Sequence, residues 1–277
     1  MRPRRRPVED GVVATFFHDG WTLAYEESGD GPAVLLLHGV LMDRTMFAHQ
    51  ADALAARYRV IRPDLRGHGE SEHRALDYTQ WDLMEDHVAL LDHLGIERAV
   101  WGGLSQGGFQ ALRAALRHPE RVEGLVLIDT QAGPEDVERS PMFEAMAQVA
   151  ATDGLNEGMA EAAIPLMFGA SASEDLTRHW IGRWMAQPTM DAVQAMRAVT
   201  TREDITGRLR EIGQPAVVIH GEEDLAIETD QAKRLADGLP NLVEFVTIPG
   251  AGHSSTVERP EAVTAVIERF LHKVAPS

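Results

Sequence analysis

Ser105 is the residue whose setting in this sequence most directly suggests chemistry. It lies between two glycines in the stretch GLSQG (103–107), after an apolar run (98–101) and before a segment with helical spacing (109–118). A serine turned outward at a sharp strand-to-helix corner has strained backbone, and glycines are needed where the strand and the helix crowd together. The N-terminus of the helix favours developing negative charge. The pattern therefore predicts a nucleophilic serine.

Such a serine needs a general base, because its hydroxyl is a poor nucleophile at neutral pH. Histidine suits this role, since its usual pKa of about 6.5 leaves it neutral and able to accept a proton. Among the 12 histidines of the chain, His253 lies in the glycine-rich stretch PGAGHSS (249–255), directly after the last predicted strand (243–248). Proteins with parallel sheets present ligand-facing groups at such strand ends. We predict that His253 is the base.

The acid that orients this histidine is predicted to be Asp224, which comes just past another predicted strand (215–220). The chain order of serine, acid and histidine is then the one expected when the nucleophile occupies a strand-to-helix corner. Asp129 ends a further predicted strand and is a rival for the same role, and Glu223 is a weaker one.

The oxyanion of a tetrahedral intermediate needs hydrogen-bond donors. We expect one donor to be the backbone N–H of Gln106, at the start of the helix, and the other to be that of Val40, in the loop after the predicted strand 33–37. His38 in this loop and His68 in the stretch GHG are predicted to shape the structure rather than to react. No pair of histidines has metal-ligand spacing with a carboxylate and a strand nearby, so we predict no metal and no cofactor.

Strand and helix patterns alternate along most of the chain. Two weakly alternating segments joined by an Asp-Gly turn predict an antiparallel hairpin (12–17 and 21–26). Continuous apolar runs separated by helical patterns then predict a mostly parallel sheet with helices on both faces. The further strands are expected at 33–37, 59–61, 98–101, 122–129, 215–220 and 243–248, and the helices at 47–58, 79–94, 109–118, 229–238 and 260–274.

The alternation stops over residues 134–209, where prolines and glycines interrupt helical spacing. We expect four or five short helices that form a lid. Most of its apolar side chains are expected to pack the lid itself, because methionine fills irregular gaps, and the others to face the cleft above the serine. Arg178 or Arg183 is a candidate partner for a substrate carboxylate. The apolar side chains are Met142, Phe143, Met146, Met159, Met167, Phe168, Trp180, Trp184, Met185, Met190 and Met196.

Composition limits the other classes of function. The 277 residues are enough for one large core, and the net charge of −17 argues against nucleic-acid binding. Residues 1–10 are expected to form a flexible basic tail. They do not match a signal peptide, because charged residues stand where its apolar part would begin. The chain has no apolar run long enough to span a bilayer and no cysteine, so we expect a cytoplasmic protein without disulfides or membrane binding. A homo-oligomer is left open.

These segments together resemble the α/β-hydrolase fold superfamily. The resemblance covers nearly the whole chain and is carried by His38-Gly39, the stretch DLRGHGES (64–71), the stretch GLSQGG, and the pair Asp224 and His253. It implies an eight-stranded, mostly parallel sheet flanked by helices, with an inserted all-helical lid. The core would comprise residues 11–133 and 210–277, and the lid residues 134–209.

Within the superfamily, the chain is most similar to oxoadipate enol-lactonase and related small ester or lactone hydrolases. GLSQGG, HPERV (118–122) and HSSTVE (253–258) carry this likeness. Dehalogenases and epoxide hydrolases of this fold place an aspartate where this chain has Ser105. Carbon–carbon bond hydrolases usually have tryptophan after the histidine, whereas Ser254 follows it here. Cofactor-free perhydrolases tend to have HGWP in the oxyanion loop, where this chain has His-Gly-Val-Leu.

The sequence thus predicts a cofactor-free serine hydrolase that cleaves a small-molecule ester or lactone through an acyl-enzyme. A cofactor-free perhydrolase of the haloperoxidase type and a carbon–carbon bond hydrolase are alternatives, since the same three residues serve both. A non-catalytic ligand-binding or signalling protein on this fold is the alternative from a different class.

Overall fold

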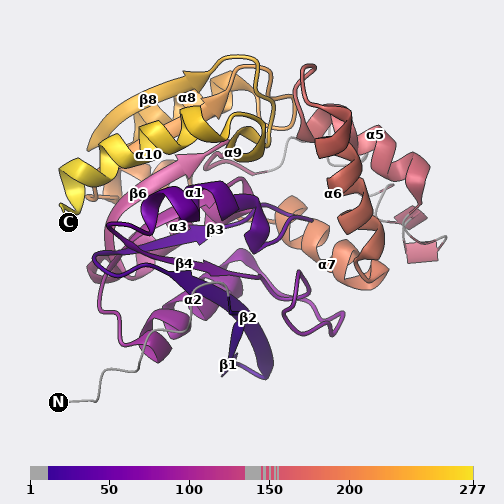
Figure 1. Cartoon of the computed structure of the whole chain (residues 1–277), viewed down its shortest axis with the longest axis horizontal. Coiled ribbons are helices and arrows are strands. Elements are labelled where there is room, and N and C mark those ends of the chain that lie inside the picture. The colour runs from indigo at the N-terminus through magenta and orange to yellow at the C-terminus, as the bar shows by residue number, and fades with distance from the viewer. Residues whose placement is uncertain are drawn as a thin grey trace.

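The computed structural model describes residues 12–134 and 156–276, with single positions between them (145, 148, 149, 151, 152 and 154). An eight-stranded sheet forms the centre of the molecule, with helices on both of its faces (Figure 1). The strand order is β1-β2-β4-β3-β5-β6-β7-β8. The expected basic tail over residues 1–10 lies outside the described residues.

The first two strands form the predicted hairpin. Strand β1 (Ala14–His18) pairs antiparallel with β2 (Trp21–Ser28), and His18 lies opposite Trp21. Both turn residues have positive φ, 47° at Asp19 and 81° at Gly20, as a two-residue hairpin of this twist requires. Strand β2 pairs antiparallel with β4, and the remaining neighbours are all parallel.

The inner parallel strands are buried on both faces, which explains their continuous apolar runs, whereas the edge strand β8 is largely half-buried or exposed. In β3, Leu35 and Leu37 belong to one core cluster, whereas Val34 and Leu36 belong to the cluster on the opposite face. Because these strands are parallel, their carboxyl ends lie at one edge of the sheet, where the loops with the predicted site residues begin. The strands are β3 (Ala33–Leu37), β4 (Arg59–Pro63), β5 (Ala99–Leu104), β6 (Val122–Ile128), β7 (Ala216–Gly221) and β8 (Leu242–Ile248).

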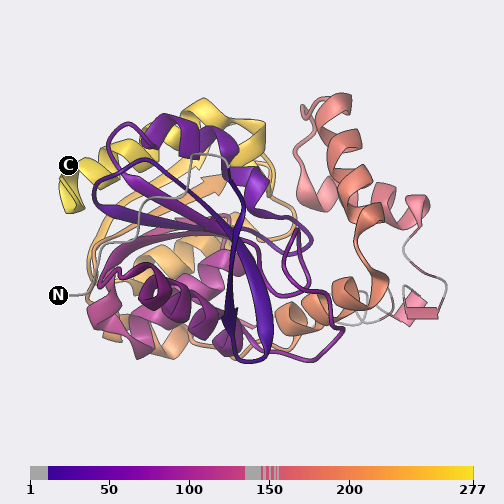
Figure 2. The ribbon, with the colours of Figure 1, turned by 60° about the horizontal axis from the view of Figure 1, so that its bottom comes forward.

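Two layers of helices cover the sheet. Helices α2, α3 and α8 contribute to one core cluster, and α1 and α10 to the other (Figure 2). Helix α2 begins with a capping box at Thr79 and ends at Gly95, which has the positive φ typical of a C-cap. The helices are α1 (Ala48–Leu54), α2 (Gln80–Leu94), α3 (Gln106–Arg117), α8 (Thr229–Gly238), α9 (Ser255–Glu258) and α10 (Pro260–Val274), with 3-10 turns at Arg44–Phe47 and Pro119–Arg121.

Between β6 and β7, the stretch that the structure describes from residue 156 onward contains three helices, which lie to one side of the sheet (Figures 1 and 2). We call α5 (Glu157–Met167), α6 (Glu174–Ala186) and α7 (Thr189–Thr200) the inserted helices. A 3-10 turn (Thr206–Glu211) leads back to the sheet, and its Leu209 packs in the core with Ile205.

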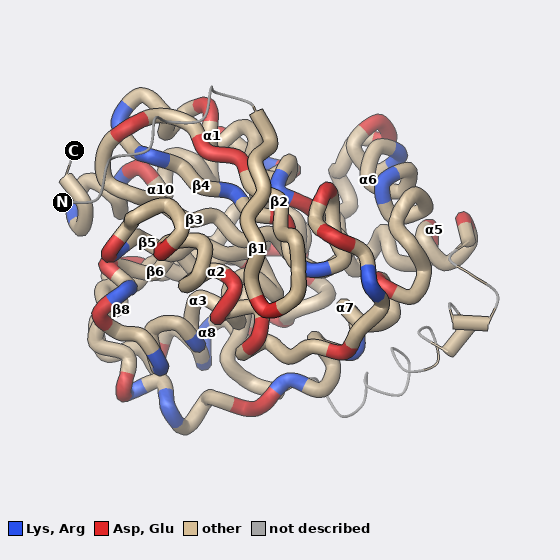
Figure 3. The backbone as a smooth tube through the Cα atoms, turned by 90° about the horizontal axis from the view of Figure 1, so that it is seen from below, with Lys and Arg blue, Asp and Glu red and all other residues tan. Residues whose placement is uncertain are grey.

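Acidic residues occur along most of the elements visible in Figure 3, interspersed with lysines and arginines. In the view of Figure 3, the acidic residues are distributed along the chain rather than confined to one segment. Among the described residues, none of the helices combines the length and the apolar character that crossing a bilayer requires.

Candidate active site

Ser105 stands at a sharp turn between β5 and α3. Its backbone has a φ of 51° and a ψ of −112°, a conformation that residues with a Cβ rarely adopt. Ser105 N donates to Ile128 O at 2.9 Å and fixes the turn to the neighbouring strand. The predicted strand-to-helix corner is therefore present, and it holds the serine at the carboxyl edge of the sheet.

Close backbone contacts require the glycines of this corner. A Cβ on Gly103 would lie 2.2 Å from the carbonyl carbon of Gly107, and one on Gly107 would lie 2.1 Å from Leu37 O on β3. A Cβ on Gly108 would lie 2.5 Å from the hydroxyl oxygen of Thr130. The glycines allow α3 to pack directly against the strands, which is the physical reason for the pattern in the sequence.

The loop after β3 runs beside the serine. A Cβ on Gly39 would lie 3.7 Å from the Cβ of Ser105. Within residues 12–134 and 156–276, neither Val40 N nor Gln106 N donates a hydrogen bond to another group. Gln106 is the first residue of α3, where free N–H groups face outward from the helix. The two N–H groups predicted to bind the oxyanion are thus available, and their role stays a prediction.

Two buried histidines hold this loop in place. Leu65 N donates to His38 Nε2 at 3.0 Å, and Leu41 N donates to His68 Nε2 at 3.2 Å. The Nδ1 of each ring lies against a backbone carbonyl. Burial lowers the pKa of His38 to about 4 and that of His68 to about 3. Both rings are therefore neutral at neutral pH and act as fixed supports.

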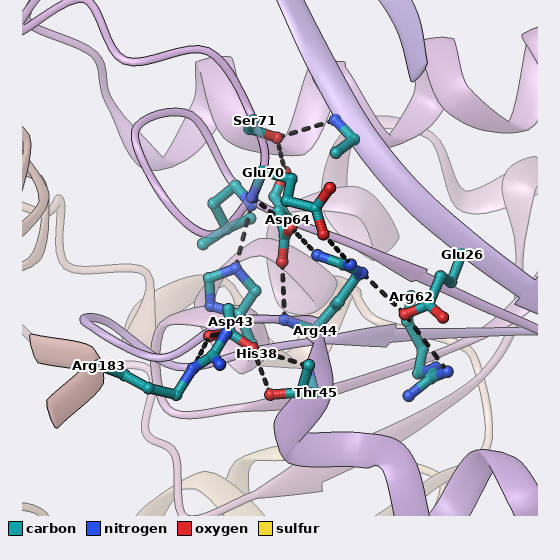
Figure 4. Close-up of polar contacts among 12 residues, drawn as sticks. Glu26, His38, Asp43, Arg44, Thr45, Arg62, Asp64, Glu70, Ser71 and Arg183 are labelled. Atoms are coloured by element: carbon teal, nitrogen blue, oxygen red, sulfur yellow. Dashed lines mark hydrogen bonds and ion pairs between the residues drawn. The ribbon is translucent and has the colours of Figure 1, made fainter. Parts of the chain in front are cut away.

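An arginine-centred network lies behind the same loop (Figure 4). The Arg44 guanidinium forms ion pairs with Asp64, with Glu26 at 2.8 Å and with Glu70 at 2.6 Å. The backbone N–H groups of Arg44 and Glu70 also donate to the Asp64 carboxylate, at 2.8 and 2.9 Å. Because three carboxylates surround one arginine, this network fixes the segment after the loop to the neighbouring strands.

The inserted helices reach the loop through Arg183 of α6. Its guanidinium pairs with Asp43, which also accepts from Thr45 N at 2.9 Å (Figure 4). Burial alone would raise the pKa of Asp43, but hydrogen bonds from Thr45 outweigh it and lower the pKa. Arg183 is therefore engaged by the protein itself. Arg178, the other candidate for a substrate carboxylate, pairs with Glu174 and Asp175 of its own helix.

Asp224 and His253 are brought together at the ends of β7 and β8. The Asp224 carboxylate can only accept, so His253 donates through Nδ1 to Asp224 Oδ2, at 2.8 Å. Asp224 Oδ1 accepts from Ala226 N and Ile227 N, both at 2.9 Å. The two side chains are nearly inaccessible to solvent. The carboxylate is held on both oxygens, and Nε2 of the ring has no hydrogen-bond partner among the residues that the structure describes.

The electrostatics of His253 differ from those of the other buried histidines. Burial by itself lowers the pKa of His253, but the charge and the hydrogen bond of Asp224 raise it, and the net shift is upward. The cation of this ring is thus stabilised where those of His38 and His68 are not. A base that carries a proton during a reaction needs this kind of support.

Asp129, the rival acid, lies in the same region but holds backbone rather than the ring. Gly221 N donates to its Oδ1 at 2.7 Å, and Ser255 Oγ donates to its Oδ2 at 2.6 Å. Burial raises the pKa of Asp129, and the nearby charge of Asp224 raises it further. Asp129 therefore ties the end of β7 to the segment after His253.

Asp129, His220 and Asp224 are fully buried, and their ligand atoms lie within 4.8 Å of one another. Asp224 Oδ2, the oxygen that lies toward His220, already accepts a hydrogen bond from His253. A cation bound there would compete with His253. Both oxygens of Asp129 are likewise bound by N–H or O–H donors. The two carboxylates are therefore already engaged by hydrogen-bond donors, which disfavours a metal ion at this set of side chains.

Ser105 and His253 are not joined by a hydrogen bond in the part of the chain that the structure describes. Thr130 Oγ1 donates to Ser105 O at 2.8 Å and links the serine to the residue after Asp129. In enzymes without bound substrate, the contact between serine and base is often longer than a hydrogen bond and tightens on binding. A hydrogen bond between the Ser105 hydroxyl and the His253 imidazole is therefore part of the proposed function.

An apolar cluster joins the corner, the loop after β3 and α7. It contains Val40, Phe109 of α3, and Ala195 and Val199 of α7, with Ile227 from the segment after Asp224. Met196 packs against it. The inserted helices thus place apolar side chains against both the loop after β3 and helix α3.

The other apolar side chains of the inserted segment behave in several ways. Phe168, Trp180 and Trp184 are buried in the core cluster that includes α1 and α10, and Met167 packs against it. Met185 and Met190 are exposed, and Met159 is half-buried. Met142, Phe143 and Met146 lie outside the described residues.

Two glutamates, Glu258 and Glu223, accept hydrogen bonds from backbone N–H groups near the site. The sequence did not predict this role for either of them. Glu258 accepts from Gly252 N at 3.0 Å and from Ser254 N at 3.3 Å, the residues on either side of His253. Glu223, a weak candidate for the acid, accepts from Ala170 N at 2.8 Å instead. A Ser-x-x-Glu pattern at 255–258 is the available signal, since such a glutamate often reaches back to backbone N–H groups.

The fold and these sites define a class. The family described as the alpha/beta hydrolase fold matches residues 32–260. The chain belongs to this family.

Individual relatives are similar over most of their length. The chain is 31% identical over 251 residues to a pimeloyl-[acyl-carrier protein] methyl ester esterase of Nitrosomonas europaea, covering 85% of this chain and 94% of the relative. A solved structure of a thermophilic esterase from Thermogutta terrifontis has a TM-score of 0.87 and 33% identity, covering 95% and 98%. The enol-lactonase from Burkholderia xenovorans LB400 has a TM-score of 0.86 and 30% identity, covering 93% and 99%.

Proposed function

We propose that this protein is a serine hydrolase that cleaves a small carboxylic ester or lactone through an acyl-enzyme. The observation that carries the proposal is the 2.8 Å hydrogen bond from His253 Nδ1 to Asp224, which leaves Nε2 as the ring nitrogen able to accept a proton. Membership of the α/β hydrolase family and the strained corner at Ser105 support the same reading.

The reaction follows from these groups. His253 Nε2 takes the hydroxyl proton as Ser105 Oγ attacks the substrate carbonyl, and the Val40 and Gln106 N–H groups hold the resulting oxyanion. The intermediate collapses, the carbon–oxygen bond to the alcohol breaks, and the imidazolium gives its proton to the leaving oxygen. Water then attacks the acyl carbon with His253 as base, the bond from that carbon to Ser105 Oγ breaks, and the imidazolium returns its proton to Ser105 Oγ as the acid is released. Asp224 orients the ring and stabilises its cation throughout.

The names of the relatives support esters and lactones as the substrate class, since they describe an esterase, a methyl ester esterase and an enol-lactonase. The apolar cluster of Val40, Phe109 and Val199 favours an apolar acyl or ring substrate of modest size. We also propose that residues 134–209 act as a lid on a core of residues 11–133 and 210–277. The cytoplasmic location stays a prediction.

A panel of short esters, lactones and amides, with peracid formation as a separate assay, tests this proposal on the wild type and Ser105→Ala. We expect ester or lactone hydrolysis by the wild type and its loss in the variant. A fluorophosphonate probe should label the wild type at Ser105 only. Probe labelling that persists in Ser105→Ala, or hydrolysis that survives it, would overturn the proposal.

The same panel separates the alternatives. Peracid formation that exceeds ester hydrolysis would indicate a perhydrolase, and turnover confined to carbon–carbon bonds would indicate that type of hydrolase. No turnover of any substrate, with no probe labelling, would favour a ligand-binding protein.

A further inference from the structure

The turn between α5 and α6 contacts both loops that carry the predicted acid and base. This turn comprises Phe168 to Ser171, and we call it the docking turn. Two successive backbone N–H groups of the turn donate to carboxylates: Gly169 N to Glu258 Oε2 and Ala170 N to Glu223 Oε2, both at 2.8 Å. Hydrogen bonds to ionised acceptors are roughly twice as strong as neutral ones.

The two carboxylates come from the loops of the acid and the base. Glu223 directly precedes Asp224. Glu258 divides its two oxygens: Oε2 holds the docking turn, whereas Oε1 accepts from Gly252 N and Ser254 N, on either side of His253. One side chain therefore binds the backbone of the base loop and that of the inserted segment at once.

Backbone packing makes this contact tight. A Cβ on Gly252 would lie 2.2 Å from Gly169 N, and a Cβ on Gly169 would lie 2.9 Å from Gly252 N. Ser171 Oγ donates to Gly250 O at 3.1 Å at the other end of the turn. A movement of the docking turn away from the sheet must therefore break contacts on both sides of the histidine.

We propose that Glu258, with Glu223, is a positioning residue that couples the docked state of the inserted helices to the placement of His253. The inference rests on the proposed function only for its effect on turnover. The coupling itself joins two backbone segments and exists whether or not the protein is a hydrolase. Neither glutamate touches the reacting atoms.

The test is a double-mutant cycle of Glu258→Gln and Gly169→Ala, which disturb the contact from the loop side and from the turn side. We expect each to lower kcat for p-nitrophenyl acetate by about 10- to 100-fold, because a displacement of about 1 Å can cost 100-fold. Each should also shift the acid limb of the pH profile, which a general loss of folded protein would not do. The double variant should lose no more than the larger single loss, since both break one contact.

Glu261→Gln is the matched control for Glu258→Gln, and Glu222→Gln is a second control beside Glu223, because both control side chains are exposed. Hydrogen exchange of the peptides spanning 168–171 and 250–255 gives a readout without turnover. It should accelerate in both peptides in Glu258→Gln and in neither with the controls. Additive losses of kcat, or exchange that changes in one peptide alone, would overturn the coupling.

A wild type that hydrolyses neither esters nor lactones would instead refute the proposed function and leave the exchange experiment to decide the coupling. Thermal unfolding of each variant checks that the folded fraction is the same at the assay temperature.

Discussion

The loop after β3 and the loop that carries His253 both lie beside buried carboxylates and histidines. The two regions differ in the basic groups that contact these carboxylates. Around the first, the buried carboxylates of Asp43 and Asp64 pair with arginines. Around the second, the basic side chains that the structure describes within 3.9 Å of the Asp129 and Asp224 carboxylates are histidines only, His220 and His253. Arginine keeps its charge at every accessible pH, whereas histidine does not.

This difference separates a fixed support from the site where we propose that protons are exchanged. In the first region, the imidazoles of His38 and His68 bond to backbone and stay neutral, with their pKa values lowered by burial. In the second region, the carboxylate beside His253 raises its pKa. The loop after β3 can therefore hold a backbone N–H donor in a fixed position. In the proposed mechanism, His253 on the other loop accepts and returns a proton.

The sharpest way to break this comparison is to neutralise the two acids beside His253 one at a time. We expect Asp224→Asn to lower kcat for p-nitrophenyl acetate by about 10⁴-fold, because the ring loses its orientation and the support for its cation. Asp129→Asn should cost no more than about tenfold, since an amide oxygen can still accept from Gly221 N. A larger loss in Asp129→Asn than in Asp224→Asn would exchange their roles.

Removal of the arginine in the first region tests its structural role. Arg44→Met leaves Asp64 buried without its ion pair, and we expect a loss of about 3–5 kcal/mol in the free energy of unfolding. Urea unfolding measures it. Arg178→Met is the control, because the ion pairs of Arg178 are exposed and should contribute little. Equal effects of the two substitutions would show that the buried network does not fix the loop.

The pH dependence of kcat/KM compares the histidines of the two regions. The neutral form of His253 is the active one, so activity should fall about tenfold per pH unit below its pKa, which lies above the usual value of about 6.5. His38 and His68 should add no ionisation above about pH 5, because their pKa values are about 4 and about 3. A midpoint below 6.5 would contradict the support by Asp224.

Local signals explain why much of the fold could be predicted from the sequence. The helices at 229–238 and 260–274 have the expected bounds, and Gly95 ends α2 as predicted. The helix expected at 47–58 is present as the shorter α1 (Ala48–Leu54), and the 3-10 turn Arg44–Phe47 precedes it. Asp43 begins the turn by accepting from the Thr45 N–H, a cap that the apolar spacing alone does not reveal.

The candidate site divides in the same way. Asp224 and His253 could be paired in advance because each follows a strand of the parallel part of the sheet, and parallel strands end at one edge. The partners of Arg44 and Glu258 could not, because those contacts join residues up to 89 positions apart without any repeating pattern. Sequence position indicates which strand end a residue follows, whereas side-chain pairing depends on how the loops then fold.

The smallest effect is expected where the first region meets the inserted helices. The Arg183 side chain is 36% exposed, so its pair with Asp43 is partly screened by solvent. We expect Arg183→Met to raise KM by about two- to fivefold with little change in kcat, since such pairs contribute at most about 1 kcal/mol. High salt should raise the KM of the wild type toward that of the variant, and Arg178→Met should leave KM unchanged.

The substrate decides what a larger effect would mean. If Arg183 only holds α6 against the oxyanion loop, neutral and acidic esters should lose affinity equally in Arg183→Met. A loss confined to substrates that carry a carboxylate would show that Arg183 leaves Asp43 to bind the ligand. Because Asp43 would then be buried without its partner, that exchange should be accompanied by a rise in the pKa of Asp43, whose carboxyl titration by NMR in the ligand-bound protein would detect it.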